Sequence, residues 1–194
     1  MATGTRESSS RQGAGWRRAL SMGKGRAPAT RDLLPTGAPW CLVQPASGTS
    51  MSNGLDLFHD AHEAGFTCAG TDNPSAFRLT CYQFDGSYLS LVAALTPAQV
   101  RALRPGRTVR LSMTTSTSRP IVAFGRLNLK TAEQTEVRHT TLVLADGDRV
   151  MDFSVDAYGL AHAALTAGWL DVIFSDPGMC ELTFTRLALE VGDP

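Results

Sequence analysis

Four side chains that can bind a metal ion lie close together in the segment FHDAHE, residues 58–63. They are His59, Asp60, His62 and Glu63. In a strand the two histidines would point to opposite faces, and their spacing differs from the H-E-x-x-H that places two histidines on one helical face. The segment DGD at residues 146–148 lacks the later ligands of a calcium loop. We therefore expect neither a metal site nor a cofactor.

Catalytic motifs give little support for an enzyme. The sequence contains no G-x-S-x-G, P-loop or protein-kinase motif. Hydrolysis by acid and base requires two carboxylates across a cleft. Five acidic residues near the end of the chain are candidates: Asp152, Asp156, Asp171, Asp176 and Glu181. Asp152 and Asp171 lie beside large apolar residues, so each is either a tuned acid or a solvated outward side chain. We expect no catalysis, with a carbohydrate-active hydrolase as the alternative.

A binding face is the better supported site. The segment FGRLNLK, residues 124–130, places Arg126, Asn128 and Lys130 on one side of a strand. Their polar groups can hydrogen bond to hydroxyls or carboxylates, and arginine adds a planar fork. Tyr88 and Trp169 can supply flat platforms for a sugar ring. The alternatives are an ordinary solvated sheet face and a Trp169 packed in the core. These five residues are our predicted carbohydrate-binding residues.

Alternation of apolar and polar residues indicates the strands that carry these side chains. It predicts about eight or nine strands. Their ranges are 57–60, 77–81, 89–95, 109–113, 121–129, 137–143, 151–155, 169–175 and 181–191. Residues 96–103 start with a threonine cap and a proline, and residues 156–168 are rich in alanine, so one or two short helices are expected. The predicted fold is all-β, an antiparallel, jelly-roll-like β-sandwich.

The segment FDGSYLSL, residues 84–91, interrupts this pattern with an Asp-Gly pair. Asp85-Gly86 between two apolar segments predicts a type I′ hairpin corner with Gly86 at positive φ. Tyr88, two residues later, is then either an inward packing group or part of a glycan site. Asp146-Gly147 is a second predicted hairpin turn.

Residues 1–34 differ in composition from the rest of the chain. They hold seven basic and two acidic residues, a charge of +5, and since the whole chain has zero net charge the remainder carries −5. With few large apolar groups, this segment cannot fold alone. We predict an arm over residues 1–34, disordered unless a partner holds it, and a sandwich domain over residues 35–194. The arm should contact other subunits, as a homo-oligomer, through Arg11, Trp16, Arg17 and Arg18.

Cysteine usage and hydropathy suggest where the protein is made. Cys41, Cys68, Cys81 and Cys180 form no C-x-x-C pair, which argues against a zinc ribbon or a thioredoxin-like motif. Reduced thiols are expected, with a Cys68–Cys81 disulfide as the alternative. The sequence shows neither an apolar signal region nor a transmembrane segment. We expect synthesis in the cytoplasm and no nucleic-acid partner.

Several ordered motifs carry a resemblance to a known family. They are LFHD, FDGSYLSL, GRLNLK, WLDVIFSDPGMC and LTFTR, and they span about residues 35–186. In them the chain resembles an uncharacterised proteobacterial family of unknown function, which is similar to jelly-roll carbohydrate-binding modules. Relatives look longer and more helical at the N-terminus. A bacterial family favours an assembly arm over an organellar transit peptide, although the arm is also rich in arginine and serine.

The expected function follows from these points. The protein should be a non-catalytic structural or binding subunit of a phage-like particle or surface appendage, with bacterial surface polysaccharide as its ligand. Such a particle would carry the protein out of the cell without a signal peptide, with the arm as its anchor. The competing hypothesis is an intracellular enzyme or regulator on the same scaffold.

Overall fold

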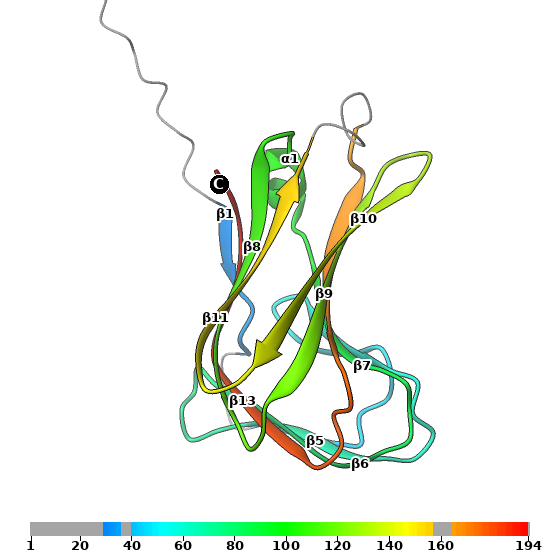
Figure 1. The fold of residues 1–194 in the computed structure, drawn as a ribbon, viewed down its shortest axis with the longest axis vertical. Helices are drawn as coiled ribbons and strands as arrows, with labels where there is room; N and C mark the ends of the chain where they lie inside the picture. Colours follow the sequence, from blue (N-terminus) through cyan, green and yellow to red (C-terminus); the bar gives the residue numbers. More distant parts are fainter. Residues whose placement is uncertain (1–28, 36–39, 157–163, 194) are drawn as a thin grey trace, which may run out of the picture.

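The computed structural model describes residues 29–35, 40–156 and 164–193. These residues form two packed antiparallel sheets (Figure 1). The seven-stranded sheet has the order β11 (Gly147–Val155), β8 (Arg107–Thr117), β13 (Cys180–Gly192), β6 (Phe77–Phe84), β5 (Ala64–Gly70) and β2 (Cys41–Val43), and β1 (Ala29–Asp32) also pairs with β13. The six-stranded sheet has the order β10 (Thr135–Leu144), β9 (Ile121–Lys130), β12 (Ala167–Phe174), β7 (Leu89–Ala94), β4 (Leu55–His59) and β3 (Thr49–Ser52). The predicted all-β sandwich is confirmed.

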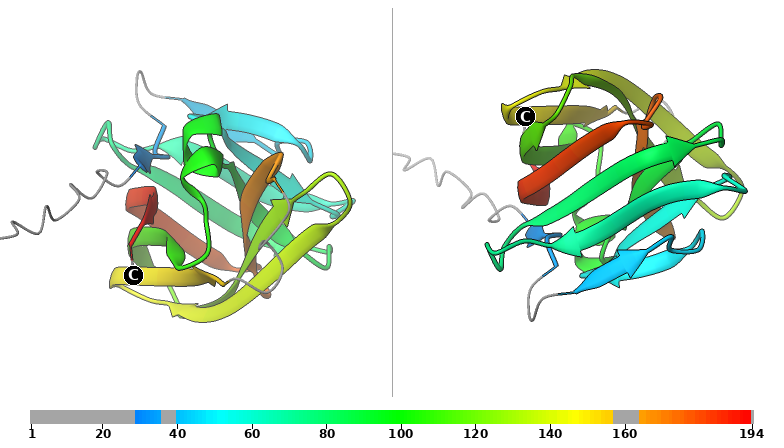
Figure 2. Two further views of the ribbon diagram at one scale, coloured as in Figure 1. Left: turned by 90° about the horizontal axis from the view of Figure 1, so that it is seen from above. Right: turned by 90° about the horizontal axis from the view of Figure 1, so that it is seen from below.

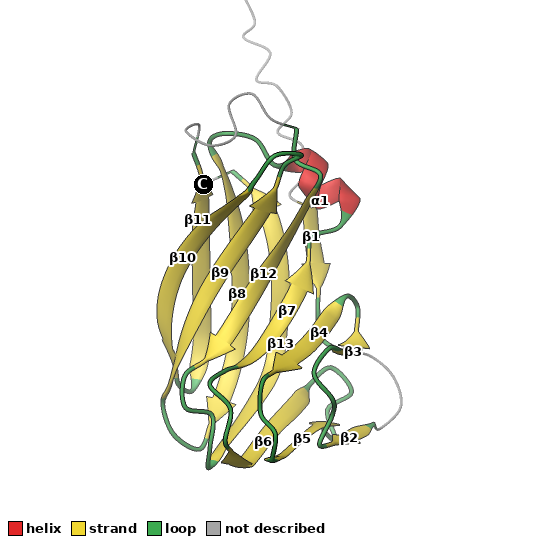
Figure 3. Ribbon diagram, turned by 90° about the vertical axis from the view of Figure 1, so that its right-hand side faces the viewer, coloured by secondary structure: helices red, strands yellow, loops and turns green. Residues whose placement is uncertain are grey.

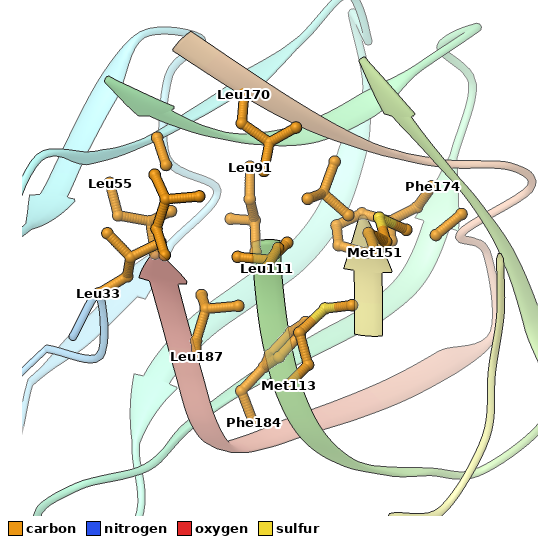
Figure 4. Close-up of a cluster of buried hydrophobic side chains, with 14 of the residues drawn as sticks. Leu33, Leu55, Leu91, Leu111, Met113, Met151, Leu170, Phe174, Phe184 and Leu187 are labelled. Atoms are coloured by element: carbon orange, nitrogen blue, oxygen red, sulfur yellow. The ribbon is translucent and has the colours of Figure 1, made fainter. Parts of the chain in front are cut away.

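Alternation along each strand builds the core between the sheets. The inward residues of the six-stranded sheet are mainly leucines, among them Leu55 and Leu91, and they face residues such as Leu111 of the seven-stranded sheet (Figure 4). Phe77 and Phe184 stack with their ring centroids 4.9 Å apart. Burying each such side chain stabilises the fold by about 1.5–3 kcal/mol.

Each of the nine predicted strands corresponds to a strand of the structure. The prediction missed β1, β2, β3 and β5. The first three have only three or four residues, which is too short for a periodic signal. The fourth has the sequence AGFTCAG, whose glycine and alanine residues disfavour a strand when judged locally.

The helix that connects strand β7 of one sheet to strand β8 of the other is predicted correctly. The α1 helix (Pro97–Ala102) begins after Thr96, which forms a capping box with Gln99, and has a proline in its first turn. Seen from above in Figure 2, it covers one end of the sandwich, where it contacts β1, β12 and β13. Of the second predicted helix, residues 157–163 lie outside the described residues, and residues 167–168 begin strand β12 instead.

The two predicted Asp-Gly hairpins are wrong. Asp85-Gly86 connects β6 to β7, and Asp146-Gly147 connects β10 to β11, so both pairs carry the chain from one sheet to the other. The tight hairpin lies at Asn53-Gly54, where both residues have positive φ and Ser52 pairs with Leu55. The φ of Gly86 is not in the left-handed region. Glycine is needed at this position because other atoms lie too close for a side chain.

The predicted boundary between arm and sandwich at residue 34 is also wrong, because residues 29–34 belong to the sandwich. Ala29–Asp32 pairs with β13, and the Leu33 amide donates to the Leu187 carbonyl at 2.8 Å. Leu33 is only 1% exposed and lies beside Leu55 in the core (Figure 4). The sandwich therefore includes β1, since pairing with β13 brings the two leucines that follow it into the core. The predicted assembly residues Arg11, Trp16, Arg17 and Arg18 lie outside the described residues.

All four cysteines are free thiols. Cys81 lies directly opposite Cys180, whereas Cys68 pairs with Leu79. Burial raises the pKa of Cys68 to about 12 and that of Cys81 to about 11. Within the described ranges, no helix is long and apolar enough to span a bilayer.

Candidate functional site

A cleft of about 550 Å³ lies on the outer face of the six-stranded sheet. Strands β4, β7, β12 and β9, which are neighbours in this sheet (Figure 3), supply its walls together with the residue just before β7. The lining residues are Phe58, Tyr88, Ser90, Val92, Arg126, Trp169, Asp171 and Ile173. The volume lies within the range typical of ligand sites.

Strand periodicity places these side chains on the outer face. On β12, Leu170 and Val172 are buried in the core, so Trp169, Asp171 and Ile173 point outward. Antiparallel pairing then sets Asp171 opposite Arg126 on β9. The cleft thus has a charged pair at its centre. Trp169 and Ile173 lie two residues before and two residues after Asp171 on the same face of β12.

Asp171 organises the polar centre. Its Oδ2 accepts a hydrogen bond from Arg126 Nε at 2.7 Å and another from Asn128 Nδ2 at 3.1 Å. The Asp171 side chain is only 4% exposed, whereas that of Arg126 is 46% exposed. A buried carboxylate requires such partners. The two Nη groups of Arg126 make no hydrogen bond to other described residues, so they can donate to a ligand.

Aromatic and apolar side chains surround this polar centre. Tyr88 and Phe58 are each more than one third exposed, and Trp169 is half-buried. Cross-strand pairing places Phe124, Ile173, Ser90 and Phe58 in one row across four strands. Flat apolar rings beside hydrogen-bonding groups suit a ligand that has both apolar faces and polar edges.

Tyr88 is held in the cleft wall by the corner that leads into β7. The Asp60 carboxylate accepts hydrogen bonds from the amides of Ser87 and Tyr88, at 2.8 and 3.1 Å, and from the Ser87 hydroxyl. The Ser87 hydroxyl and the Tyr88 amide are the main causes that lower the pKa of Asp60. In return, Asp85 accepts from the amides of His62 and Glu63 at 3.1 Å. The two loops are thereby locked together.

The two loops of this corner approach each other most closely at Gly86. A Cβ on Gly86 would lie 2.5 Å from Asp60 Oδ1 and 2.7 Å from the Ala61 amide nitrogen. Side chains do not tolerate such distances, so glycine is required here by close approach of the two loops and not by its φ.

Three of the five predicted binding residues line the cleft. They are Tyr88, Arg126 and Trp169, all outward-facing, so neither aromatic residue is an inward core group. Asn128 is buried beside the cleft and supports Asp171. Lys130 shares their face of β9 but is not among the lining residues. Whether any of them binds carbohydrate stays a prediction.

Sequence reasoning missed the remaining lining residues. Ile173 alternates with Trp169 on β12, so the same strand pattern could have identified it. Asp171 was considered only as a catalytic acid or a solvated side chain, and it is neither solvated nor free. Phe58 and Ser90 come from strands whose position beside β12 has no local sequence signal.

The five candidate acids of the hydrolase alternative do not converge. Asp152 forms a two-point ion pair with Arg110 on the seven-stranded sheet, at 2.7 and 2.8 Å. Asp156 binds Arg138 at 2.7 Å. Of the five, Asp171 alone is among the described residues that line the cleft.

Within the FHDAHE segment, the His59 ring is held by backbone and aromatic contacts. The His59 ring packs edge-on against Phe66 with the centroids 5.2 Å apart, and its Nε2 lies 3.0 Å from the Pro45 carbonyl. Among the described residues, no three His, Cys, Asp or Glu side chains are placed to hold one metal ion.

The outer face of the seven-stranded sheet contrasts with the cleft. Two pairs of its charged side chains form ion pairs, Arg110 with Asp152 and Arg78 with Glu181. The Thr114 hydroxyl donates to Asp148. Such mutually paired groups are typical of a solvated surface.

The chain has distant similarities to several solved structures. One is to the enzymatically active domain of bacteriophage CBA120 tailspike protein 4, with 9% identity and a TM-score of 0.48 over 70% of this chain. This chain covers only 19% of that one. Another is to the CBM22-1 xylan-binding domain of Paenibacillus barcinonensis Xyn10C, with 9% identity and a TM-score of 0.42 over 82% of this chain and 97% of that one. A third is to the xyloglucanase domain of NopAA from Sinorhizobium fredii, with 9% identity and a TM-score of 0.48 over 78% and 98%.

Sequence comparison places the chain in a family. No curated protein matches it. A family model described as a family of unknown function, DUF6478, matches residues 33–191. This match covers most of the sandwich and confirms the resemblance to a family of unknown function. The chain belongs to the DUF6478 family.

Proposed function

We propose that the cleft on the six-stranded sheet binds carbohydrate and that the protein is a binding subunit without catalytic activity. The observation that carries this proposal is the arrangement of Tyr88, Phe58 and Trp169 around the Arg126–Asp171 pair. Sugar rings have apolar faces that stack on aromatic rings and hydroxyl edges that hydrogen bond to charged groups. The cleft offers both in one place.

The Arg126–Asp171 pair is suited to hold hydroxyl groups. Asp171 Oδ2 accepts hydrogen bonds from Arg126 Nε and Asn128 Nδ2, and the first of these holds the guanidinium while leaving its Nη groups for the ligand. A preorganised donor of this kind loses little conformational entropy on binding.

We prefer binding to hydrolysis because the cleft lacks a second carboxylate among its lining residues. Glycoside hydrolysis generally uses two carboxyl groups about 5–10 Å apart, one of them able to transfer a proton. The cleft lining has one, Asp171, and it is engaged by two hydrogen bonds. The enzyme alternative predicts release of reducing ends from a bound polysaccharide, and binding alone predicts none.

We further propose that the protein acts as one subunit of a phage-like particle or surface appendage. The charge separation between residues 1–34 and the remainder supports this, because a basic segment favours docking on an acidic surface such as the next copy of the chain. Light scattering on the full chain at low and high salt tests it. Oligomers that dissociate with salt are expected, and a monomer at all concentrations would contradict it.

A glycan array probed with the full chain tests the cleft. Wild-type protein should bind a bacterial surface polysaccharide, and Tyr88→Ala, Trp169→Ala and Arg126→Ala should each weaken binding about thirtyfold, or about 2 kcal/mol, if they are central contacts. Tyr82→Ala and Arg110→Ala are matched controls on the seven-stranded sheet and should bind normally. Absence of binding to every polysaccharide, or equal losses in the controls, would rule out the proposal.

A further inference from the structure

A second concave surface lies on the other side of β4 from the cleft. Its volume is about 510 Å³, and the loops after β2 and β4, the start of β5 and the end of β6 supply its walls. His59 lines it, whereas the preceding residue, Phe58, lines the cleft. Successive residues of a strand point to opposite faces, so the two sites lie on different surfaces.

Hydrogen bonds hold the backbone of this pocket in place. The Pro45 carbonyl can only accept, so His59 Nε2 carries the proton and donates to it at 3.0 Å. The Gln44 amide donates to the Phe66 carbonyl at 2.9 Å, which keeps Gln44 at a φ of 48°. A left-handed φ at a residue with a side chain is strained, and such strain often occurs at functional sites.

The polar side chains around the pocket are uncommitted. Those of Gln44, His62, Glu63 and Gln83 form no hydrogen bond or ion pair with other described residues. His59 Nδ1 is buried and also lacks a partner in the described part of the chain. A fixed frame with free hydrogen-bonding groups is the arrangement that recognition of a polar ligand requires.

We propose that this pocket binds a single polyhydroxylated group, namely a monosaccharide or the terminal residue of a glycan. Hydroxyls donate and accept, which matches the two glutamine amides, the His62 ring and the Glu63 carboxylate. The apolar members of the lining are the buried Phe66 and Pro45 and the more accessible Ala46 and Ala61, which can contact C–H groups. Glu63 is the acidic member of the lining and disfavours an anion. This site does not depend on carbohydrate binding in the cleft.

Nuclear magnetic resonance of the ¹⁵N-labelled full chain tests the pocket directly. The probes are glucose, galactose, mannose and N-acetylglucosamine, each titrated to tens of millimolar. With at least one of them, the side-chain amides of Gln44 and Gln83 should shift and saturate. The shifts should persist in the Tyr88→Ala/Trp169→Ala double variant, which removes the aromatic wall of the cleft.

A conservative variant separates a binding site from a surface effect. Glu63→Gln preserves size and should weaken the interaction about tenfold, the usual cost of losing one hydrogen bond to a charged group. Glu133→Gln, in the loop between β9 and β10, is the control and should leave affinity unchanged. The proposal is overturned if no sugar shifts the two amides, if only cleft residues shift, or if Glu63→Gln has no effect. Loss of cleft binding on the array would leave these results unaffected.

Discussion

Replacing Gly86 tests the account of the corner that positions Tyr88. A Cβ at this position would lie 2.5 Å from Asp60 Oδ1, 2.7 Å from the Ala61 nitrogen and 2.9 Å from a ring carbon of Phe84. Two of these three atoms belong to the neighbouring loop, and one of them is a backbone nitrogen. Rotation of the Asp60 side chain alone would therefore not relieve the contact. Overpacking of this kind costs about 1–3 kcal/mol, which is the expected effect of Gly86→Ala on the free energy of unfolding.

Urea unfolding of the full chain, followed by tryptophan fluorescence, measures this cost as a change in midpoint at constant slope. Gly86→Asn distinguishes the steric explanation from a left-handed backbone. Asparagine tolerates positive φ better than alanine, so a left-handed Gly86 would make Gly86→Asn the milder change. Close contact makes it at least as destabilising as Gly86→Ala.

The Asp60 contact can be isolated with a double-mutant cycle. In an Asp60→Ala background the closest atom is gone, so Gly86→Ala should cost less than in the wild type. Gly106→Ala is the control: Gly106 has a φ of +82° with nothing within 4 Å of its added Cβ, so its cost should not change with Asp60. A cost for Gly86→Ala below about 0.5 kcal/mol, or one independent of Asp60, would refute the reasoning.

Three further predictions address the core, the thiols and pH dependence. Leu33→Ala should lower the free energy of unfolding by about 2–5 kcal/mol, whereas Val43→Ala, at an exposed site, should change it by less than about 0.5 kcal/mol in the same urea assay. At neutral pH a thiol reagent should label only Cys41 in the native protein and the other three cysteines after unfolding, as counted by mass spectrometry; labelling of a second thiol in the folded state would contradict the burial. Because hydrogen bonds from Ser87 and Tyr88 lower the pKa of Asp60, its stabilising effect is present above the ordinary aspartate pKa and is lost as pH falls through the lowered value. The difference in Tm between wild type and Asp60→Asn should therefore disappear in strong acid, and a difference that grows there would contradict this sign.

Strand positions could be predicted from the sequence because most long strands have one face in the core. The exception is β10, where Leu144 is the one buried residue and Val137 and Val143 are exposed. The alternation around Leu170 and Val172 is enough to place Trp169 on the outer face, and the same holds for Arg126 beside Leu127. Local pattern therefore accounts for two of the lining residues, Arg126 and Trp169. It could not indicate that β12 lies between β9 and β7, so the pairing of Arg126 with Asp171, 45 residues apart, was not predictable.

Turns were less predictable than strands for a related reason. Asn53-Gly54, Asp85-Gly86 and Asp146-Gly147 look alike in sequence, but only the first closes a tight hairpin. Whether a turn returns to the same sheet depends on which strands are already paired, and that is a property of the whole fold. The pairing of β1 with β13, at opposite ends of the chain, escapes local reasoning in the same way.

The residues of the cleft are consequently held in position in two different ways. Arg126 and Asp171 project from neighbouring central strands, whose ladder fixes their separation. Tyr88 instead depends on the crossing between sheets, since its amide is held by Asp60 from another loop. Changes at Asp60 or Gly86 should therefore move Tyr88 and leave Trp169 and the charged centre in place, because no ladder pairing of β9 or β12 passes through that corner. If the cleft binds carbohydrate, such variants should lose stacking affinity while retaining the contribution of Arg126.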